Sequence, residues 1–158
     1  MADIQKGSRI PTDLTFTGAE GPVRLGDLVG HKVLVLYFYP KDETTGCTAE
    51  ACSFRDLYQD FLDAGADVIG VSKDSAEAHE KFKKNHRLPF RLLTDKGGAG
   101  AAALGVKKDF GLFPGRVTFV IDKTGVVRMR FDSQIQARKH VSEALDMVRS
   151  LNRAAAVG

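Results

Sequence analysis

The sequence predicts an α/β fold in which a mixed, mainly parallel central sheet is flanked by helices and preceded by an N-terminal β-hairpin. Residues 33–39 are seven consecutive apolar residues, rich in β-branched and aromatic types. Such a run is typical of a strand that is buried on both faces. From there on, strand-like and helix-like segments alternate along the chain, which is the pattern of a sheet covered by helices.

The other elements follow from the same patterns. Short apolar pieces at residues 14–16 and 23–25 surround a Gly-Pro turn and predict the hairpin, and Gly26 to Gly30 predict a short helical turn. Asp74 is expected to cap a helix, with Glu77 three residues on. Further strands are expected at residues 67–71, 90–94, 116–121 and 126–131, and further helices at residues 47–64, before Pro89, after Gly100 and at residues 137–151.

Length and composition indicate an ordinary globular protein. The 158 residues are expected to form one domain, 1–158, with residues 153–158 as a frayed tail. A net charge of +3 is too small to imply a nucleic acid or a membrane surface as a partner, and the basic cluster at residues 81–87 is interpreted as a solvated helix face. No stretch approaches the ~20 apolar residues of a membrane span, and residues 1–30 lack the apolar region of a secretory signal.

The candidate reactive group is Cys47, which follows a polar loop at residues 40–46 and lies in the first turn of the next helix. The first N–H groups of a helix have no internal partner and the helix dipole adds positive charge there, so this position favours the nucleophilic thiolate. On a helical wheel Cys47 lies with Phe54 and is expected to face a pocket, whereas Cys52 lies about 140° away on a polar side. The alternative is that both cysteines are inert packing residues, and the polar surroundings of Cys52 argue against it.

The loop and helix start closely resemble the active-site segment of peroxiredoxins, and more narrowly of the group called peroxiredoxin Q or bacterioferritin comigratory protein. The family's pattern of Pro, three residues, Thr, two residues, Cys is met by Pro40, Thr44 and Cys47. The group's resolving cysteine, five positions later, is met by Cys52. Thr45 departs from the pattern, because the group commonly has proline there, but this change touches none of the reacting groups.

A second segment extends the resemblance over nearly the whole chain. Residues 112–122 resemble the family's second active-site segment, with Arg116 at the position of its essential arginine. The resemblance implies a thioredoxin-like fold and a thiol-specific peroxidase without cofactor or metal. It also implies hydrogen peroxide and organic hydroperoxides as substrates, recycling by thioredoxin or a similar dithiol, and a monomer.

The resemblance also implies a role for each site residue. Cys47 would attack one peroxide oxygen and become a sulfenic acid, and Cys52 would then form an intramolecular disulfide with it. Arg116 would supply a permanent cation with forked donors, Thr44 a hydroxyl that orients thiolate and peroxide, and Pro40 a shield against water. Taken singly, Thr44 could be a plain helix cap, Pro40 a strand terminator and Arg116 a surface arginine.

Other polar residues are assigned more simply. Glu50, one turn into the helix, is a candidate partner for an arginine. The glycines at residues 97–100 do not have the spacing of a dinucleotide loop and predict a turn before a short helix. The histidines show no metal-ligand spacing and are expected at the surface, namely His31, His79, His86 and His140.

Two other classes compete with the peroxidase. A thiol–disulfide oxidoreductase usually has two residues between its cysteines, whereas four separate Cys47 from Cys52, and no proline immediately precedes Val117. A redox sensor or binding module without enzymatic activity could use the same two cysteines. Two cysteines are too few for a secreted disulfide scaffold, so we expect a reducing compartment. That compartment is the cytoplasm if the protein is bacterial, or a plastid if the chain is a mature form from a photosynthetic eukaryote.

Overall fold

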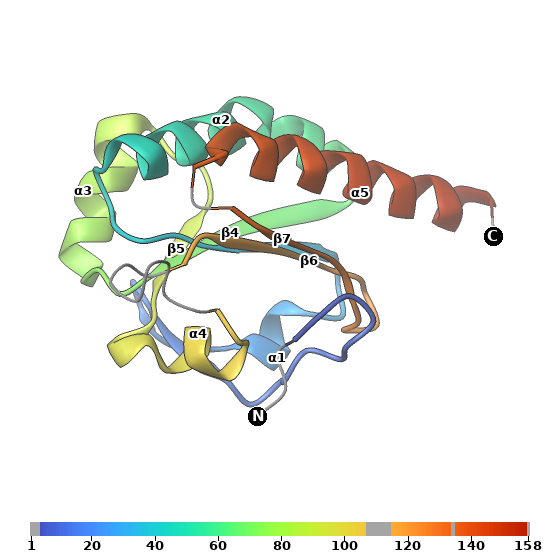
Figure 1. Ribbon diagram of the computed structural model, residues 1–158, viewed down its shortest axis with the longest axis horizontal. Coiled ribbons are helices and arrows are strands. Elements are labelled where there is room, and N and C mark those ends of the chain that lie inside the picture. Colours follow the sequence, from blue (N-terminus) through green and yellow to red (C-terminus); the bar gives the residue numbers. More distant parts are fainter. Residues whose placement is uncertain (1–3, 107–114, 134, 158) are drawn as a thin grey trace.

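The computed structural model describes residues 4–106, 115–133 and 135–157. The described strands form one seven-stranded sheet, and helices cover both of its faces. Figure 1 shows α2, α3 and α5 on one face and α1 and α4 on the other. The α/β prediction with helices on both faces is therefore confirmed.

Most predicted elements are present with boundaries shifted by one or two residues. The strands are β1 (Thr15–Gly18), β2 (Gly21–Arg24), β3 (Val33–Phe38), β4 (Ala66–Ser72), β5 (Arg91–Thr94), β6 (Val117–Ile121) and β7 (Val127–Asp132). The helices are α1 (Leu25–Leu28), α2 (Thr45–Asp63), α3 (Ala76–His86), the 3-10 turn η1 (Lys96–Gly98), α4 (Ala99–Ala103) and α5 (Ala137–Val157). No helix in the described part of the chain combines the length and the apolar character that a membrane crossing requires.

The sheet is mixed, but its expected mainly parallel character is wrong. The strand order is β2-β1-β5-β4-β3-β6-β7, and of the pairings between described strands only β3–β4 and β4–β5 are parallel. The N-terminal hairpin β1–β2 pairs antiparallel with β5, and the hairpin β6–β7 pairs antiparallel with β3. Helices α2 and α3 connect β3 to β4 and β4 to β5, and these are the strands that pair in parallel.

Strand β3 lies near the centre of the sheet and its six residues are all buried. Alternate side chains serve two separate cores, because successive residues of a strand point to opposite faces. Val35 and Tyr37 pack with α2 and α5, whereas Leu34 and Leu36 pack with the side that carries α1 and α4. The long apolar run predicted this two-sided burial, and the carboxyl end of β3 delivers the chain to residues 40–46.

Two helix ends differ from expectation. Asp74 does not cap α3: Ser75 occupies the N-cap and its Oγ accepts the N–H of Ala78. Asp74 instead accepts the hydroxyl of Ser72 and a backbone N–H from the loop after β3, which fixes that loop to the sheet. At the other end of the chain α5 continues to Val157, beyond the end expected at residue 151.

The turn between β6 and β7 is organised by the buried carboxylate of Asp122. Its oxygens accept the N–H and hydroxyl of Thr124, the N–H of Val126 and Nε of Arg128, over distances of 2.6–3.0 Å. Burial raises the pKa of Asp122, but these donors outweigh burial and lower it to about 2. The ionised carboxylate therefore stabilises the native hairpin.

We predict that Asp122→Asn lowers the free energy of unfolding at neutral pH by about 1–3 kcal/mol, since charge-assisted hydrogen bonds are lost. The native pKa lies below the ordinary value of 3.8, so the stabilisation is present above about pH 4 and is lost as the pH falls through about 2. Urea unfolding of both proteins at several pH values should show a difference that shrinks across this window. The exposed-site variant Glu77→Gln is the control, and a difference that does not change with pH would contradict the assignment.

Candidate active site

The carboxyl end of β3 and the start of α2 together place Cys47. Thr44 has extended backbone angles at the N-cap of α2, and its carbonyl accepts the N–H of Thr48 as the first helical bond. Cys47 lies in the first turn with a side chain 1% exposed, packed in the core beneath the helix. Both Cys47 and Cys52 are free thiols. The thiol that sequence reasoning selected is thus held, buried, at the positive end of a helix dipole.

Arg116 reaches the same place from a different part of the chain. Strand β6 pairs with β3 in a register that sets Val117 opposite Phe38, so Arg116, the residue before β6, lies beside the end of β3. Its Nη2 donates to Sγ of Cys47 at 3.4 Å, and its Nη1 donates to Oε1 of Glu50 at 2.6 Å. One buried guanidinium therefore contacts both groups, and the sequence-based prediction that Glu50 pairs with an arginine is confirmed.

Gly46 allows this approach. A Cβ at Gly46 would lie 2.9 Å from Nη2 of Arg116, closer than real Cβ contacts. Gly46, in the first turn of α2, therefore permits the close approach of the guanidinium, a role that its position in the sequence did not reveal.

The remaining predicted site residues, which are near Cys47 in the sequence, differ in their exposure to solvent. Thr44 is exposed, and its hydroxyl donates to the carbonyl of Lys41 at 3.0 Å rather than capping the helix. Pro40 is half-buried at the end of β3, and Cys52 is half-buried on α2. Residues 112–114 of the second predicted segment lie outside the described residues.

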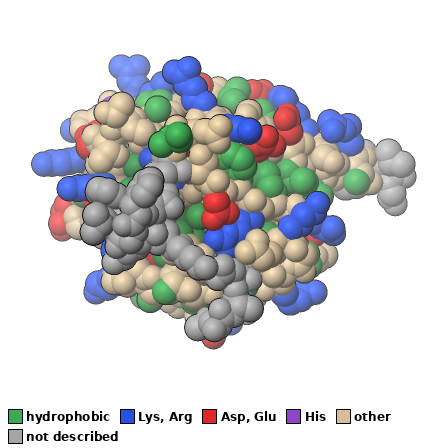
Figure 2. Space-filling view, viewed as in Figure 1, with side chains coloured by type: hydrophobic (Ala, Val, Ile, Leu, Met, Phe, Trp, Pro, Cys, Tyr) green, Lys and Arg blue, Asp and Glu red, His purple; other side chains and the backbone are tan. Residues whose placement is uncertain are grey.

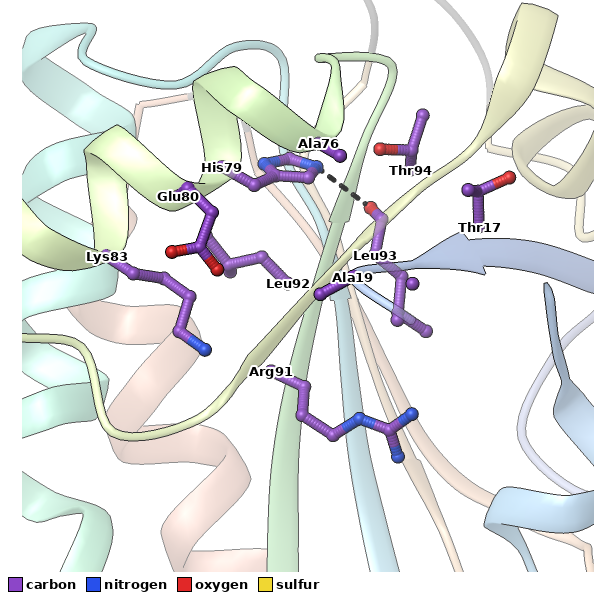
Figure 3. A pocket seen from close by; sticks show the side chains of 11 residues that line it. Thr17, Ala19, Ala76, His79, Glu80, Lys83, Arg91, Leu92, Leu93 and Thr94 are labelled. Carbon is purple, nitrogen blue, oxygen red and sulfur yellow. Dashed lines mark hydrogen bonds between the residues drawn. The ribbon is translucent and has the colours of Figure 1, made fainter. Parts of the chain in front are cut away.

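The loop between Pro40 and Thr44 is fixed by a buried carboxylate. Asp42 accepts the hydroxyl of Tyr39 at 2.6 Å, and its other carboxylate oxygen lies 2.7 Å from Nδ1 of His79. Nε2 of His79 donates to the carbonyl of Leu93 at 3.1 Å, a contact drawn in Figure 3 beside a small cavity of about 60 Å³ between α3 and β5. His79 is therefore buried and was wrongly expected at the surface.

A second carboxylate fixes the same loop from outside. Glu43 has a left-handed backbone with φ +64°, and its side chain accepts Nδ2 of Asn85 at 2.6 Å and contacts Nε2 of His86 at 2.7 Å. These two partners lower the pKa of Glu43, against a small opposing effect of burial. Nη1 of Arg55 donates to the carbonyl of the same His86 at 2.8 Å. The end of α3 therefore holds the chain on both sides of the segment that contains the two cysteines.

Behind Cys47 lies a buried polar cluster. Glu50 is fully buried, and burial raises its pKa to about 8 although Arg116 opposes the shift. His140, expected at the surface, is also fully buried: its Nε2 donates to the carbonyl of Ser133, and its Nδ1 accepts the hydroxyl of Thr118. Burial, assisted by Arg116, lowers the pKa of His140 to about 4, so the ring is neutral. Of the four histidines, only His31 is exposed.

Among the described residues, no group of three or more His, Cys, Asp or Glu side chains could hold a metal ion. What the site does bring together is a buried thiol, a helix N-terminus and a guanidinium. Together the guanidinium and the helix N-terminus can stabilise negative charge that develops on a bound oxygen.

Comparison with known proteins shows the family to which the chain belongs. The AhpC/TSA family profile matches residues 7–130. The chain belongs to the AhpC/TSA family of peroxiredoxins. The chain is 48% identical to the chloroplastic peroxiredoxin Q of Sedum lineare over 96% of this chain and 81% of the relative. It is also 47% identical to that of Oryza sativa subsp. japonica, over 94% and 68%.

Solved peroxiredoxins have the same fold. Peroxidoxin BcpB from Mycobacterium tuberculosis is 35% identical, with a TM-score of 0.85 over 94% of this chain and 98% of that one. PrxQ from Xylella fastidiosa is 26% identical, also with a TM-score of 0.85, over 96% and 99%. The thioredoxin-like fold, the peroxiredoxin Q grouping and a thiol peroxidase activity are therefore established for this peroxiredoxin at the level of the family.

Sequence reasoning missed those residues of the candidate site that are defined by tertiary contact. Gly46 is needed because Arg116 packs against it, and Asp42 with His79 fixes the loop from beneath. His140 lies with Nδ1 3.7 Å from Oε2 of Glu50. The signal in the sequence was weak, since a polar residue on an otherwise apolar helical face, such as His140 between Ala137 and Ala144, indicates only that a buried partner exists.

We predict that Arg116→Ala slows the reaction of the reduced protein with peroxide by roughly 10²–10³-fold, the scale for loss of one transition-state donor. Arg116→Lys should recover only part of the rate, because a point charge cannot reproduce two forked donors. Stopped-flow measurement of thiol oxidation tests both. Arg91→Ala, at an exposed arginine on β5, is the control, and a wild-type rate in Arg116→Ala would exclude the guanidinium from the reaction.

Proposed function

We propose that Cys47 is the peroxidatic thiol of this peroxiredoxin and Cys52 its resolving thiol, and that the enzyme reduces hydrogen peroxide and organic hydroperoxides. The observation that carries the proposal is the 3.4 Å contact between Nη2 of Arg116 and Sγ of Cys47 at the start of α2. A thiol with both a cation and a helix N-terminus is poised as a nucleophile.

In the first step the Cys47 thiolate attacks one oxygen of the peroxide. The S–O bond forms as the O–O bond breaks, and the departing oxygen leaves as hydroxide or alkoxide, which takes up a proton. Arg116 and the first N–H groups of α2 stabilise the negative charge along this axis. The nearby hydroxyl of Thr44 orients the thiolate and peroxide once it leaves its bond to the Lys41 carbonyl, and Pro40 limits access of water.

In the second step the thiol of Cys52 attacks the Cys47 sulfenic acid, releasing water and forming a disulfide. Both cysteines lie in the continuous helix α2. Five helical residues separate two Cα atoms by roughly 8.7 Å and turn the side chains about 140° apart. A disulfide needs Cα atoms about 4.4–6.8 Å apart, so the first turns of α2 must unwind.

The contacts around α2 indicate how far this unwinding extends along the chain. Phe54 is fully buried and stacks on Tyr37 with ring centroids 4.5 Å apart, and Arg55 is bonded to the end of α3. Before the cysteines, Glu43 is bonded to the same end of α3. The segment between Glu43 and Phe54 can therefore open while its flanks stay in place, which keeps the cost of opening local.

The proposed substrates and reductant are inferred from the relatives of this peroxiredoxin. The bacterioferritin comigratory protein of Xanthomonas campestris, whose solved structure is 29% identical to this chain, has alkyl peroxide reduction activity, which supports organic hydroperoxides as substrates here. Thioredoxin or a similar dithiol is the expected reductant, acting on the disulfide by thiol exchange. The chloroplastic names of the plant relatives support a plastid location, and the bacterial cytoplasm is the alternative.

We further propose that the peroxiredoxin works as a monomer and without nucleic acid. Figure 2 shows Lys and Arg side chains spread over the visible face and mixed with acidic ones, rather than gathered in one patch. A net charge of +3 is also modest for binding a polyanion.

We predict that Cys47→Ser abolishes peroxide turnover, because a serine hydroxyl is not appreciably ionised at neutral pH. Cys52→Ser should still react once, at close to the wild-type rate, and stop at the sulfenic acid. Stopped-flow kinetics with trapping of the sulfenic acid by a dimedone-type reagent distinguishes the two variants. Turnover by Cys47→Ser at the wild-type rate would overturn the assignment of roles.

We also predict that oxidation unfolds the start of α2. Amides 48–54 should exchange with solvent faster in the disulfide form than in the reduced form, whereas the amides of α3 should keep their protection. Cys52→Ser treated with peroxide is the matched control, because it is oxidised at Cys47 but cannot form the bond. A disulfide that forms while amides 48–54 keep their reduced-state protection would show that the pairing is wrong.

A further inference from the structure

Arg116 contacts two acids at once. Nη1 lies 2.6 Å from Oε1 of Glu50 and Nη2 lies 3.4 Å from Sγ of Cys47, and the three side chains are at most 4% exposed. If both acids were ionised, two negative charges would share this cation away from water. Buried charges of this kind are costly unless they are paired. The geometry therefore favours one negative charge beside Arg116 rather than two.

The surroundings of the second oxygen of Glu50 indicate that Glu50, rather than Cys47, is the acid that stays protonated. No donor from the described residues reaches Oε2 of Glu50. The nearest ring nitrogen is Nδ1 of His140 at 3.7 Å, and this nitrogen already accepts the hydroxyl of Thr118. A carboxylate with one bare buried oxygen is poorly stabilised, whereas a carboxylic acid needs fewer donors. The raised pKa of Glu50, about 8, agrees with this geometry.

Other titratable groups around Glu50 do not supply a compensating charge. From β3, Tyr37 is fully buried and burial raises the pKa of its hydroxyl well above the ordinary value, so Tyr37 stays neutral. From α5, His140 is neutral because its pKa is lowered to about 4. Among the described groups around Glu50, the net charge of the buried cluster is therefore set by Cys47, Glu50 and Arg116.

We propose that Glu50 is the proton reservoir of the peroxide reaction: it is protonated while Cys47 is a thiolate, and it gives up its proton when Cys47 becomes a sulfenic acid. This inference rests on the proposed role of Cys47 as the peroxidatic thiol. Glu50 acts through Arg116, as a positioning residue whose charge replaces that of the consumed thiolate.

The proton and charge balance is complete. The thiolate and ROOH give the sulfenic acid and RO⁻, with the S–O bond formed and the O–O bond broken. RO⁻ takes up one proton and Glu50 gives one up, so that ROH forms with no net uptake of a proton from the solution. Before the step, thiolate, carboxylic acid and guanidinium sum to zero. Afterwards, sulfenic acid, carboxylate and guanidinium again sum to zero, so no net charge is created in the buried cluster.

The test is the proton stoichiometry of the first step. Reduced Cys52→Ser protein, which stops at the sulfenic acid, is mixed with hydrogen peroxide in weak buffer with a pH indicator, and thiol oxidation is followed in parallel. At about pH 7 this protein should take up one proton fewer per oxidised thiol than the same protein with Glu50→Gln. Glutamine keeps an oxygen that can accept Nη1 of Arg116, so the shape of the site is conserved while its proton store is lost.

Two controls define the result. Glu77→Gln, at an exposed glutamate on α3, should match the parent in proton uptake. At a pH about 1.5 units above the Glu50 pKa, Glu50 is already ionised before the reaction, so the parent and Glu50→Gln should take up protons equally. If the parent and Glu50→Gln took up equal numbers of protons at pH 7 while both thiols were oxidised rapidly, the proposed role of Glu50 would be overturned and the proposed function would stand. Absence of rapid thiol oxidation in the parent protein would instead overturn the proposed function.

A measurement on the unaltered glutamate covers the case in which Glu50→Gln fails to fold. Infrared difference spectra of Cys52→Ser protein, before and after peroxide, should show loss of a carboxylic acid C=O band that shifts in heavy water, with a matching gain of carboxylate absorption. Thermal unfolding establishes whether the Glu50→Gln protein is folded. An unchanged carboxylic acid band on complete oxidation of Cys47 would overturn the proposal.

Discussion

The buried guanidinium of Arg116 is the constraint on which the site depends. A guanidinium remains charged in proteins, so its burial at 4% exposure has to be compensated by acids that face it. Glu50 and Cys47 are these acids, and their interactions raise the pKa of Arg116 in spite of burial. The same contacts explain why the helix start carries a glycine at position 46, since a larger residue would displace the cation from the thiol.

Helix α3 supports the site without contributing a reacting group. His79 in its first half holds the loop through Asp42, and Asn85 and His86 at its end hold Glu43. The left-handed backbone of Glu43 is unusual for a residue other than glycine, and its two side-chain contacts give a reason for its persistence. The loop before Cys47 is therefore a fixed connection, anchored from beneath and from its outer side.

The two halves of α2 differ in how firmly they are held. From Phe54 onwards the helix packs into one core of the protein, with aromatic contacts from Phe54 to Tyr37 and from Phe54 and Tyr58 to Phe90. In the first turns Cys47 belongs to the same core, but Cys47 and Glu50 are also hydrogen-bonded to one buried cation, Arg116. Oxidation of Cys47 changes the charges around that cation, so the part of the helix that must move is also the part whose stability depends on redox state.

The sequence by itself determined the α/β class, the central buried strand, the N-terminal hairpin and the presence of a cysteine at a helix start. These features follow from local periodicity and turn residues, which act over a few neighbours. Tertiary structure alone decided the mostly antiparallel pairing, the burial of His79 and His140, and the approach of Gly46 to Arg116. It also decided that Asp74 fixes a loop while Ser75 caps α3. Each of these depends on residues that are distant in sequence, and sequence periodicity does not record which polar side chains will meet across the sheet.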